Sequence, residues 1–394
     1  MRSMLPHVGR VGAAASVTLA LQGTAILTLA PHDYGLFASF YIVLGVGNAA
    51  VYSLVSEPWA IQSRSEPWAS YSTALIFVAG LALIPVILVA IAADQRLLGG
   101  LFGVAIFASI WRLGARYYSV AEGQLHHVTN ADLLGAVVFL VVYVLAQAFL
   151  PGLESIGVAW TASSLATLLL SERFVLRPRR YPPIRWLREH WKTAKHLATD
   201  SALLEAGSAG TLIILSPLMG LANFGVYRSI SSTGLPVRLV LNPLRPNLAN
   251  ARISTLVSGK VTAALVVVAL LFGLACWVTL TLIEVAGFFS DSTLAALATF
   301  KIPASLFVAA SLAETYYYLC LRVKFAGVRL VAYRGAQLAL ALALPLAGFT
   351  LAGLGGAVWG YVAMTLLMAL ISGVLLHVLG HRASGTNPEP LASR

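Results

Sequence analysis

The chain has 394 residues, of which 59% are hydrophobic and only 10% are charged. A water-soluble protein carries roughly a quarter charged residues, so this composition excludes a cytosolic enzyme, a nucleic-acid-binding protein and a disordered scaffold. The net charge of +11 predicts basic loops that face anionic lipid on the cytoplasmic side of a membrane. Cys276 and Cys320 stand in apolar runs and are predicted to be small buried residues rather than a disulfide framework.

Apolar runs follow one another along the whole chain. A transmembrane helix needs about 20 apolar residues, and the alternating polarity of a barrel is absent, so helices are the spanning structure that satisfies the backbone. The predicted spans are residues 11–30, 35–55, 71–93, 99–118, 132–150, 154–171, 199–218, 224–244, 262–285, 302–321, 330–350 and 354–378. The sequence therefore predicts an all-α polytopic membrane protein of about twelve transmembrane helices, with short loops and no large soluble domain.

The distribution of Lys and Arg predicts the orientation. With the N-terminus inside, the outer loops hold only Arg96 and Lys301. The inner loops then hold Arg64, Arg112, Arg116, the dense run 173–195, Arg245, Arg252, Lys260, Arg322, Lys324, Arg329, Arg334 and Arg382. Since cytoplasmic loops carry the excess of basic residues, the sequence predicts a multi-pass protein of the cytoplasmic (inner) membrane with both termini in the cytoplasm.

The one long internal loop, residues 172–198, is strongly basic. Its apolar residues recur at helical spacing and its basic residues recur one position later. They are Ile184, Leu187, Trp191 and Ala194, and Arg185, Arg188, Lys192 and Lys195. This pattern is typical of an amphipathic helix that lies on the inner leaflet, and a simple positive-inside linker is a compatible interpretation. The loop divides the chain into an N-terminal six-helix lobe (1–171), this linker (172–198), a C-terminal six-helix lobe (199–380) and a cytoplasmic tail (381–394).

The two halves carry similar short motifs. Residues 33–39 and residues 223–229 both read polar, aromatic, Gly, aliphatic, aromatic, any residue, Ser. Likewise, Tyr117-Tyr118 precedes Gly135-Ala136 at the same spacing at which Tyr317-Tyr318 precedes Gly335-Ala336. Both motifs fall at equivalent places of the two halves, which favours an internal duplication. Because six spans is an even number, the repeats are predicted to be parallel, an arrangement typical of transporters that rock one lobe against the other.

A third short repeat lies in the first inner loop, where residues 56–60 and 65–69 both read Ser-Glu-Pro-Trp-Ala. We interpret Trp59 and Trp68 as anchors at the membrane interface, where tryptophan is enriched.

Two of these elements also resemble those of a known family. Asp33-Tyr34-Gly35-Leu36-Phe37 after the first span resembles the start of the Wzx-type polysaccharide flippases. These belong to the multidrug/oligosaccharidyl-lipid/polysaccharide (MOP) exporter superfamily. Phe224-Gly225-Val226-Tyr227 resembles the matching place in their second lobe, and the layout is similar over about residues 8–380.

The resemblance implies a MATE-like fold of two bundles and a transporter rather than an enzyme. It further implies translocation of a polyprenyl-diphosphate-linked oligosaccharide across the cytoplasmic membrane, by alternating access, for surface polysaccharide biosynthesis. The implied partners are this lipid-linked glycan, membrane lipids, and the glycan polymerase and glycosyltransferases of the same pathway.

Three other classes of membrane protein are alternatives to this function. Cation-coupled multidrug exporters of the same superfamily tend to carry an acidic residue in the first helix, and the span 11–30 has none. That favours the lipid-sugar branch, with the multidrug exporter as the alternative. Major facilitator transporters carry a Gly-x-x-x-Asp-Arg-x-Gly-Arg loop between spans two and three, which residues 56–70 do not match. A membrane glycan polymerase or ligase would need a large outer loop with arginines, and every outer loop is short.

Charged residues inside spans are costly in lipid and are therefore candidate functional residues. Glu205 and Glu314 lie roughly 9 Å and 12 Å from the inner ends of their spans, and Asp200 lies at the start of span seven. The resemblance places coupling-ion carboxylates on these helices. We therefore hypothesise that the three acidic residues bind a coupling Na⁺ or H⁺; the alternative is that each pairs with a neighbouring Arg or Tyr hydroxyl.

Arginines on span eight are candidates for contact with the cargo. Arg228 and Arg238 lie about 80° apart around the helix, so both could border one cavity, and guanidinium groups suit the oxygens of a diphosphate. Arg238 is the stronger candidate because it is nearer the cytoplasmic side, and a purely structural role is equally compatible with the sequence. Arg245 and Arg252 are either portal residues that gather the head group or ordinary positive-inside residues. Gly234 and Pro236 predict a bend.

The sequence shows no Gly-rich phosphate loop, no Ser/His/Asp set and no cluster of metal ligands. It thus predicts no catalytic residue, no metal and no cofactor besides the coupling ion. Tyr316, Tyr317 and Tyr318 could stack on sugars, but an aromatic belt at the interface is the favoured interpretation.

Overall fold

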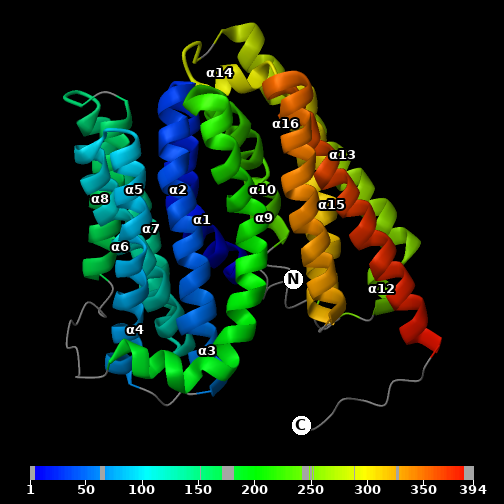
Figure 1. Ribbon diagram of the computed structural model, residues 1–394, viewed down its shortest axis with the longest axis horizontal. Coiled ribbons are helices and arrows are strands. Elements are labelled where there is room, and N and C mark those ends of the chain that lie inside the picture. The colour runs from blue at the N-terminus through cyan, green and yellow to red at the C-terminus, as the bar shows by residue number, and fades with distance from the viewer. Residues whose placement is uncertain are drawn as a thin grey trace. The chain divides into compact units, whose positions relative to one another are not determined.

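The computed structural model describes residues 5–62, 67–150, 152–170, 182–241, 248, 251, 253–287, 289–324 and 328–385. Over these ranges the chain is helical and contains no strand (Figure 1). The predicted all-α class is therefore confirmed for the part of the chain that the structure describes.

The first six predicted spans correspond to the helices before residue 171. The helices are α1 (Leu5–Thr28), α2 (Pro31–Val51), α3 (Glu57–Gln62), α4 (Trp68–Leu81), α5 (Leu83–Ala92), α6 (Arg96–Ala121), α7 (Leu125–Ala146) and α8 (Leu153–Leu170). A π-helical turn, Tyr52–Ser56, joins α2 to α3. The third predicted span consists of α4 and α5 in succession.

The second half contains two very long helices that are broken internally. Its helices are α9 (Pro183–Ser232), α10 (Leu235–Leu241), α12 (Ile253–Leu256), α13 (Gly259–Ala286), α14 (Thr293–Ala298), α15 (Lys301–Lys324) and α16 (Val328–Gly385). Gly220 has φ 74° within α9, and Gly353 has φ 58° within α16. Because positive φ ends a right-handed helix and is readily adopted by Gly, each of the two helices supplies two predicted spans.

Length and hydropathy identify seven described helices that can cross a membrane. They are Pro31–Ile61, Trp68–Ala92, Arg96–Ala121, His126–Ala146, Gly259–Ala286, Lys301–Arg322 and Ala332–Leu379. The last has 48 residues, more than twice what one crossing needs, and it contains the break at Gly353. Shorter apolar helices occur at Ala15–Thr28 and Leu153–Leu169.

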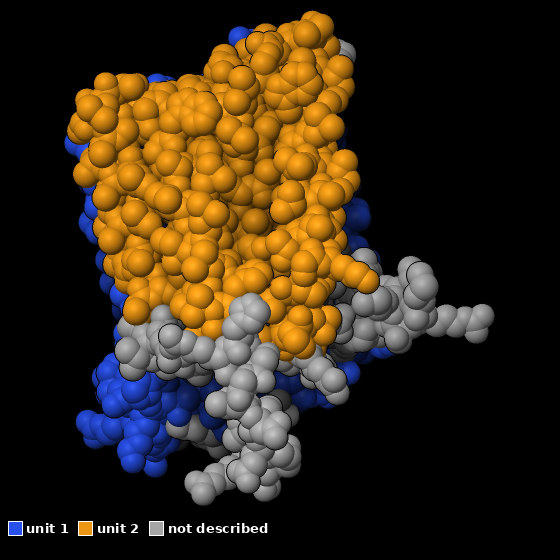
Figure 2. Space-filling model, turned by 90° about the vertical axis from the view of Figure 1, so that its right-hand side faces the viewer, with its two compact units in different colours: residues 1–225, 291–293 blue, residues 226–290, 294–394 orange. Residues whose placement is uncertain are grey.

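The chain forms two compact units, coloured separately in Figure 2. Unit 1 comprises residues 1–225 and 291–293, and unit 2 comprises residues 226–290 and 294–394. The predicted lobes divide at the loop 172–198, whereas residues 199–225 belong to unit 1. Residues 291–293 join unit 1 because the backbone N–H and the hydroxyl of Thr293 both donate to the carbonyl of Leu29, at 2.8 and 2.9 Å.

A very close backbone contact holds the end of this segment in unit 1. A Cβ on Gly35 would lie 2.1 Å from the carbonyl oxygen of Leu221, and a Cβ on Gly225 would lie 2.0 Å from that of Pro31. Only glycine fits at such distances, as in other membrane helix pairs with small residues at the crossing. Gly35 and Gly225 are the equivalent glycines of the two copies of the repeated motif.

Each unit is organised around one central helix. In unit 1, α6 packs against α2, α4, α5, α7 and α8, and its buried Phe102 stacks on Phe40 with ring centroids 4.7 Å apart. In unit 2, α15 packs against α10, α13 and α16. A Cβ on Gly273 of α13 would lie 3.0 Å from the carbonyl oxygen of Ser305, so α13 and α15 also approach closely through a small residue.

The first part of α9 is the predicted amphipathic helix, and one of its faces packs on protein. In Figure 1 it lies across the ends of α3 and α4. Trp186, His190 and Ala194 are buried, whereas Ile184 is 65% exposed and Trp191 is 52% exposed. The helix is thus packed on protein through the face of Trp186, His190 and Ala194, whereas Ile184 and Trp191 stay exposed. Contact of these exposed residues with the inner leaflet stays a prediction.

The buried face of α9 meets an aromatic cluster. Trp186 stacks on His190, with ring centroids 4.1 Å apart, and its indole meets the ring of Tyr71 edge to face. Trp59 and Trp68 from the repeated Ser-Glu-Pro-Trp-Ala motif pack against Tyr118, with ring centroids 4.7 and 5.1 Å from that of Tyr118. Trp59 is 1% exposed, so its interpretation as an interface anchor is wrong, because Tyr71 of α4 and Tyr118 of α6 pack against it.

Candidate functional site

Unit 1 contains a buried cluster of three charged side chains. Asp132 near the start of α7 is 2% exposed and accepts hydrogen bonds from two arginines of α6. Nη2 of Arg112 donates to Oδ1, and Nε of Arg116 donates to Oδ2 at 3.1 Å. The arginines are one turn apart, so both can reach the same carboxylate. We call these residues the charged triad.

The triad carries a net charge of +1 when its carboxylate is ionised. A guanidinium is always charged in proteins and presents five N–H donors in a rigid plane. Asp132 accepts from one nitrogen of each arginine, so further donors remain for another acceptor. The side chains of Arg112 and Arg116 are 16% and 32% exposed, which gives an additional anion access to them.

The sequence analysis missed this triad. It counted Arg112 and Arg116 with the inner-loop residues although both lie within the predicted span 99–118, and α6 runs on to Ala121, about 14 Å of helix beyond Arg112. It also took Asp132 only as the start of the fifth span, although α7 begins at Leu125. The available signal was the pair of arginines four residues apart, followed by a lone acidic residue within an apolar run.

Unit 2 contains a second polar cluster, built on α15 and α16. Glu314 accepts hydrogen bonds from the hydroxyl of Tyr333 at 3.2 Å and from the hydroxyl of Thr315 at 3.5 Å. Arg334 is 1% exposed, donates to the hydroxyl of Tyr318 and lies 4.1 Å from the centre of that ring. The ring of Tyr318 in turn stacks on that of Tyr333. A cation–π contact and neutral acceptors thus hold the buried guanidinium.

The two clusters lie close to the same two stretches of the repeated motif, within two residues of equivalent positions, but the signs of their charges are exchanged between the helices. The motif residues Tyr117, Tyr118 and Gly135 recur as Tyr317, Tyr318 and Gly335, so α6 and α7 correspond to α15 and the first part of α16. The basic residues are on α6 and the acidic residue is on α7 in unit 1. In unit 2, the acidic Glu314 is on α15 and the basic Arg334 is on α16.

The remaining predicted acidic residues lie on α9. Asp200 and Glu205 are both partly buried and belong to unit 1, whereas Glu314 belongs to unit 2. A shared cation site of these residues stays a prediction. Among the described residues, no group of three or more His, Cys, Asp or Glu side chains could hold a metal ion.

Two of the predicted cargo residues, Arg228 and Arg238, lie on either side of the break between α9 and α10. Arg228 is partly buried near the end of α9 and donates to the hydroxyl of Ser231. Arg238 lies on α10, but its side chain is outside what the structure describes, and Arg245 and Arg252 lie outside the described residues. The predicted bend near Gly234 and Pro236 coincides with the gap between the two helices.

Comparison with known proteins identifies the fold. No family model and no curated protein matches the sequence, but solved structures match it over nearly their full length. An inward-facing multidrug resistance MATE family transporter of the MOP superfamily matches with a TM-score of 0.65 and 16% identity, covering 97% of this chain and 100% of that one. An outward-facing one matches with a TM-score of 0.60 and 14% identity, covering 97% and 96%.

A further match is a MOP superfamily transporter from Pyrococcus furiosus, described as having a binding pocket of reverse polarity that suggests a different function. Its TM-score is 0.57 at 13% identity, with 97% of this chain and 95% of that chain covered. The chain therefore has the fold of MATE-type transporters, and the predicted fold class is confirmed. At these identities the likeness concerns the fold alone.

Proposed function

We propose that this protein is a flippase that carries a polyprenyl-diphosphate-linked oligosaccharide from the inner to the outer leaflet of the cytoplasmic membrane by alternating access. The transporter fold supports movement of a cargo across a membrane. The charged triad of Arg112, Asp132 and Arg116 is the observation that favours an anionic cargo, because it is a net positive site within membrane-crossing helices.

The sign of this charge distinguishes the candidate cargoes. Charged groups within a bilayer are expensive, and their presence there favours a functional role. A net positive site attracts a diphosphate, whose oxygens match the planar fork of a guanidinium, and it repels a cationic drug. Arg228 and Arg238 would supply further contacts to the diphosphate, with Arg245 and Arg252 at the portal where the lipid head group enters.

The acidic residues would couple transport to an ion. Glu314 already accepts two hydroxyl hydrogen bonds, and oxygen ligands of this kind suit either a proton or a hard cation. We expect Glu314→Gln, Glu205→Gln and, more weakly, Asp200→Asn to reduce the dependence of transport on Na⁺ or H⁺. The coupling assignment fails if Glu314→Gln and Glu205→Gln leave both transport and its ion dependence intact.

The second candidate is a cation-coupled multidrug exporter, favoured by the description of the solved neighbours as multidrug transporters. Deleting the gene and extracting the lipids separates the two functions. The flippase predicts accumulation of a lipid-linked oligosaccharide on the cytoplasmic face and unchanged sensitivity to cationic dyes. Unchanged lipids together with increased dye sensitivity would instead establish the exporter.

The role of the triad itself is tested with Arg116→Gln, because Arg116 is its more exposed arginine and the remaining Arg112–Asp132 pair is neutral. Loss of a hydrogen bond between charged groups should lower the flipping rate in proteoliposomes by about tenfold or more. Arg185→Gln is the matched control, since Arg185 is exposed and pairs with Glu189 on the same helix face. Normal flipping by well-folded Arg116→Gln protein would remove the triad from the cargo path.

A further inference from the structure

We propose that the first part of α9 is a binding surface for anionic phospholipids of the cytoplasmic leaflet, and that its occupation accelerates transport. This segment has three distinct faces, lies at the end of a predicted membrane span, and is joined through Tyr71 to the helix that carries the arginines of the charged triad. The lipid site holds for any cargo, whereas the acceleration rests on the proposed function.

The three faces follow one another around the helix. At about 100° per residue, a buried face spans about 80°, an apolar face spans about the next 60°, and a basic face spans about 60° beyond it. The buried face consists of Trp186, His190 and Ala194, the apolar face of Ile184, Leu187 and Trp191, and the basic face of Arg188, Lys192 and Lys195. Packing on the protein accounts for the first face and leaves the other two to be explained.

The basic face is open to a ligand. Its residues Arg188, Lys192 and Lys195 are all exposed, and they form an ion pair with no carboxylate among the described residues. Arg185 lies beyond the edge of this face and is neutralised by Glu189, so it is not part of it. Three positive charges thus lie directly beside an apolar strip.

The helix lies where the hydrocarbon of a bilayer is expected to end. Trp186 contacts Tyr71, the first residue of the third predicted span, and Figure 1 shows the helix across the ends of α3 and α4. This span end is on the side predicted to be cytoplasmic. The apolar face, exposed at Ile184 and Trp191 and half-buried at Leu187, can therefore enter the boundary between head groups and acyl chains.

An anionic leaflet matches both exposed faces at once. Its acyl chains receive the apolar strip, and its phosphates receive the Arg and Lys head groups. Each basic residue near such a surface contributes about a factor of five in affinity. A soluble acidic partner would match the basic face and leave Ile184 and Trp191 in water.

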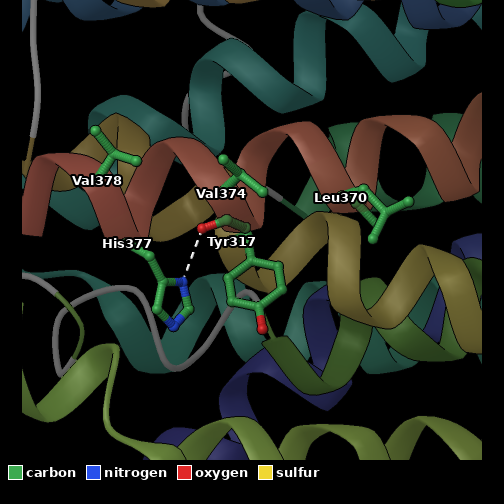
Figure 3. A pocket seen from close by; sticks show the side chains of 7 residues that line it. Tyr317, Leu370, Val374, His377 and Val378 are labelled. Carbon is green, nitrogen blue, oxygen red and sulfur yellow. Dashed lines mark hydrogen bonds between the residues drawn. The ribbon is translucent and has the colours of Figure 1, made fainter.

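A second apolar surface, on unit 2, provides the contrast. Leu370 and Val374 of α16 are 64% and 63% exposed and lie beside Tyr317 (Figure 3). The described residues that line this shallow depression include no Lys or Arg. A surface of this kind contacts acyl chains without selecting a charged head group, so it serves as an internal reference for α9.

The buried face of α9 connects the lipid surface to the charged triad. Trp186 meets the ring of Tyr71 edge to face, and the hydroxyl of Tyr71 donates to the carbonyl of Gly114 at 2.9 Å. Gly114 lies midway between Arg112 and Arg116 on α6. A lipid that binds α9 in this packed position favours it over other positions, and thereby stabilises the turn of α6 that carries the two arginines.

The site is tested with full-length protein in phosphatidylcholine nanodiscs. These contain a trace of either phosphatidylglycerol or phosphatidylcholine that bears a photoreactive diazirine on its acyl chain near the glycerol, and crosslinks are mapped by mass spectrometry. The ratio of phosphatidylglycerol to phosphatidylcholine labelling on the apolar face of α9 should exceed the ratio at Leu370 and Val374. We expect an excess of about tenfold or more, because several basic residues contribute.

Two double variants of exposed residues separate a specific surface from net charge. Arg188→Gln/Lys192→Gln should lower the excess by about tenfold or more. Arg96→Gln/Lys260→Gln removes the same charge elsewhere and should leave the excess unchanged. Equal ratios on the two surfaces, or an excess that survives Arg188→Gln/Lys192→Gln, would overturn the site. Absence of labelling on α9 by either probe would also overturn it, in favour of a soluble acidic partner.

The acceleration is measured as flipping of a labelled lipid-linked oligosaccharide in proteoliposomes of phosphatidylcholine, with and without phosphatidylglycerol. Phosphatidylglycerol should raise the wild-type rate by about fivefold or more, the usual size of a coupling between two sites. Arg188→Gln/Lys192→Gln should keep the rate in phosphatidylcholine and lose the increase. Tyr71→Phe removes the hydrogen bond to Gly114 but keeps the ring, so it should retain the labelling of α9 and lose the increase as well.

The outcomes distinguish the lipid site from the proposed function. An undiminished increase in Arg188→Gln/Lys192→Gln would refute the acceleration through α9, and an undiminished increase in Tyr71→Phe would refute the connection through Gly114. Absence of flipping in every lipid composition would overturn the proposed function together with the acceleration, whereas the labelling of α9 would still decide the lipid site.

Discussion

At the scale of single residues, the charged triad shows how one carboxylate can make two intramembrane arginines tolerable. Asp132 is nearly fully buried and is held by Arg112 and Arg116 on its two oxygens. A buried charge without a partner is far more costly than a buried pair, so the three residues depend on one another. Arg334 is accommodated differently, by an aromatic face and neutral oxygen acceptors.

Removing the carboxylate should therefore be more harmful than removing one arginine. Asp132→Asn leaves two partly buried guanidinium groups without their shared carboxylate, and we expect a loss of about 3 kcal/mol in the free energy of unfolding, the lower end of the range for breaking a buried pair. Arg116→Gln leaves a one-to-one pair and should cost clearly less. Thermal unfolding of both variants in the same detergent measures the difference, and Asp132→Asn protein as stable as the wild type would contradict it.

At the scale of elements, α9 and α2 illustrate two ways in which a helix is fixed to its neighbours. The first part of α9 is held through a large buried aromatic, Trp186, in contact with Tyr71 and His190. The start of α2 is held by the opposite means, the absence of a side chain at Gly35. Each mechanism makes its own prediction.

Two tryptophans of α9 form a matched pair. Trp186→Ala should lower the free energy of unfolding by about 3–5 kcal/mol, as expected when a large aromatic is removed from a packed core. Trp191 is 52% exposed, so Trp191→Ala should have a much smaller effect. Denaturation of the two variants, followed by far-UV circular dichroism, tests this; equal losses would mean that both faces of the helix are packed.

The glycine contact predicts a strong effect of a single methyl group. Gly35→Ala and Gly225→Ala should each destabilise the protein by about 1–3 kcal/mol, because the added Cβ overlaps a backbone carbonyl. In contrast, Gly100→Ala adds its Cβ to open space and should be neutral or stabilising by up to about 1 kcal/mol. The unfolding midpoints of the three variants test this prediction. The same midpoint for all three would argue against the close backbone contacts at Gly35 and Gly225.

At the scale of the whole molecule, the orientation can be measured directly. With Cys276 and Cys320 replaced by Ser, a single cysteine at Asp94 should react with a membrane-impermeant maleimide in intact cells, because this turn is predicted to be outside. A cysteine at Glu122 should react only after the membrane is permeabilised. Reaction of both positions from one side would refute the alternation on which the span count rests.

Hydropathy alone predicted the architecture because apolar length is what the bilayer requires of a helix. It could not predict which apolar face of a helix meets protein, since lipid and protein interiors are similarly apolar. For this reason the sequence indicated Ile184 and Trp191 as a face of α9 on the inner leaflet but did not indicate that Trp186 and His190 pack on protein. The triad was not predicted because Arg112 and Arg116, although within the predicted span 99–118 and one turn apart, were counted with the inner-loop residues, while Asp132 stands on the next span.

The contact between Gly35 and Gly225 has a consequence for how the chain can change over evolutionary time. In a symmetric dimer of identical chains, a residue near the two-fold axis meets its own copy, and under the predicted duplication the two motif glycines, which approach each other in this chain, would derive from one such residue. In an ancestral homodimer, a single substitution at such a position would place two new side chains at the same contact. Once the copies are fused, each can vary separately, but any side chain gained by one must be accommodated by the other. We therefore expect these two positions to covary as a pair among descendants of the same duplication, even where the rest of the two halves has diverged.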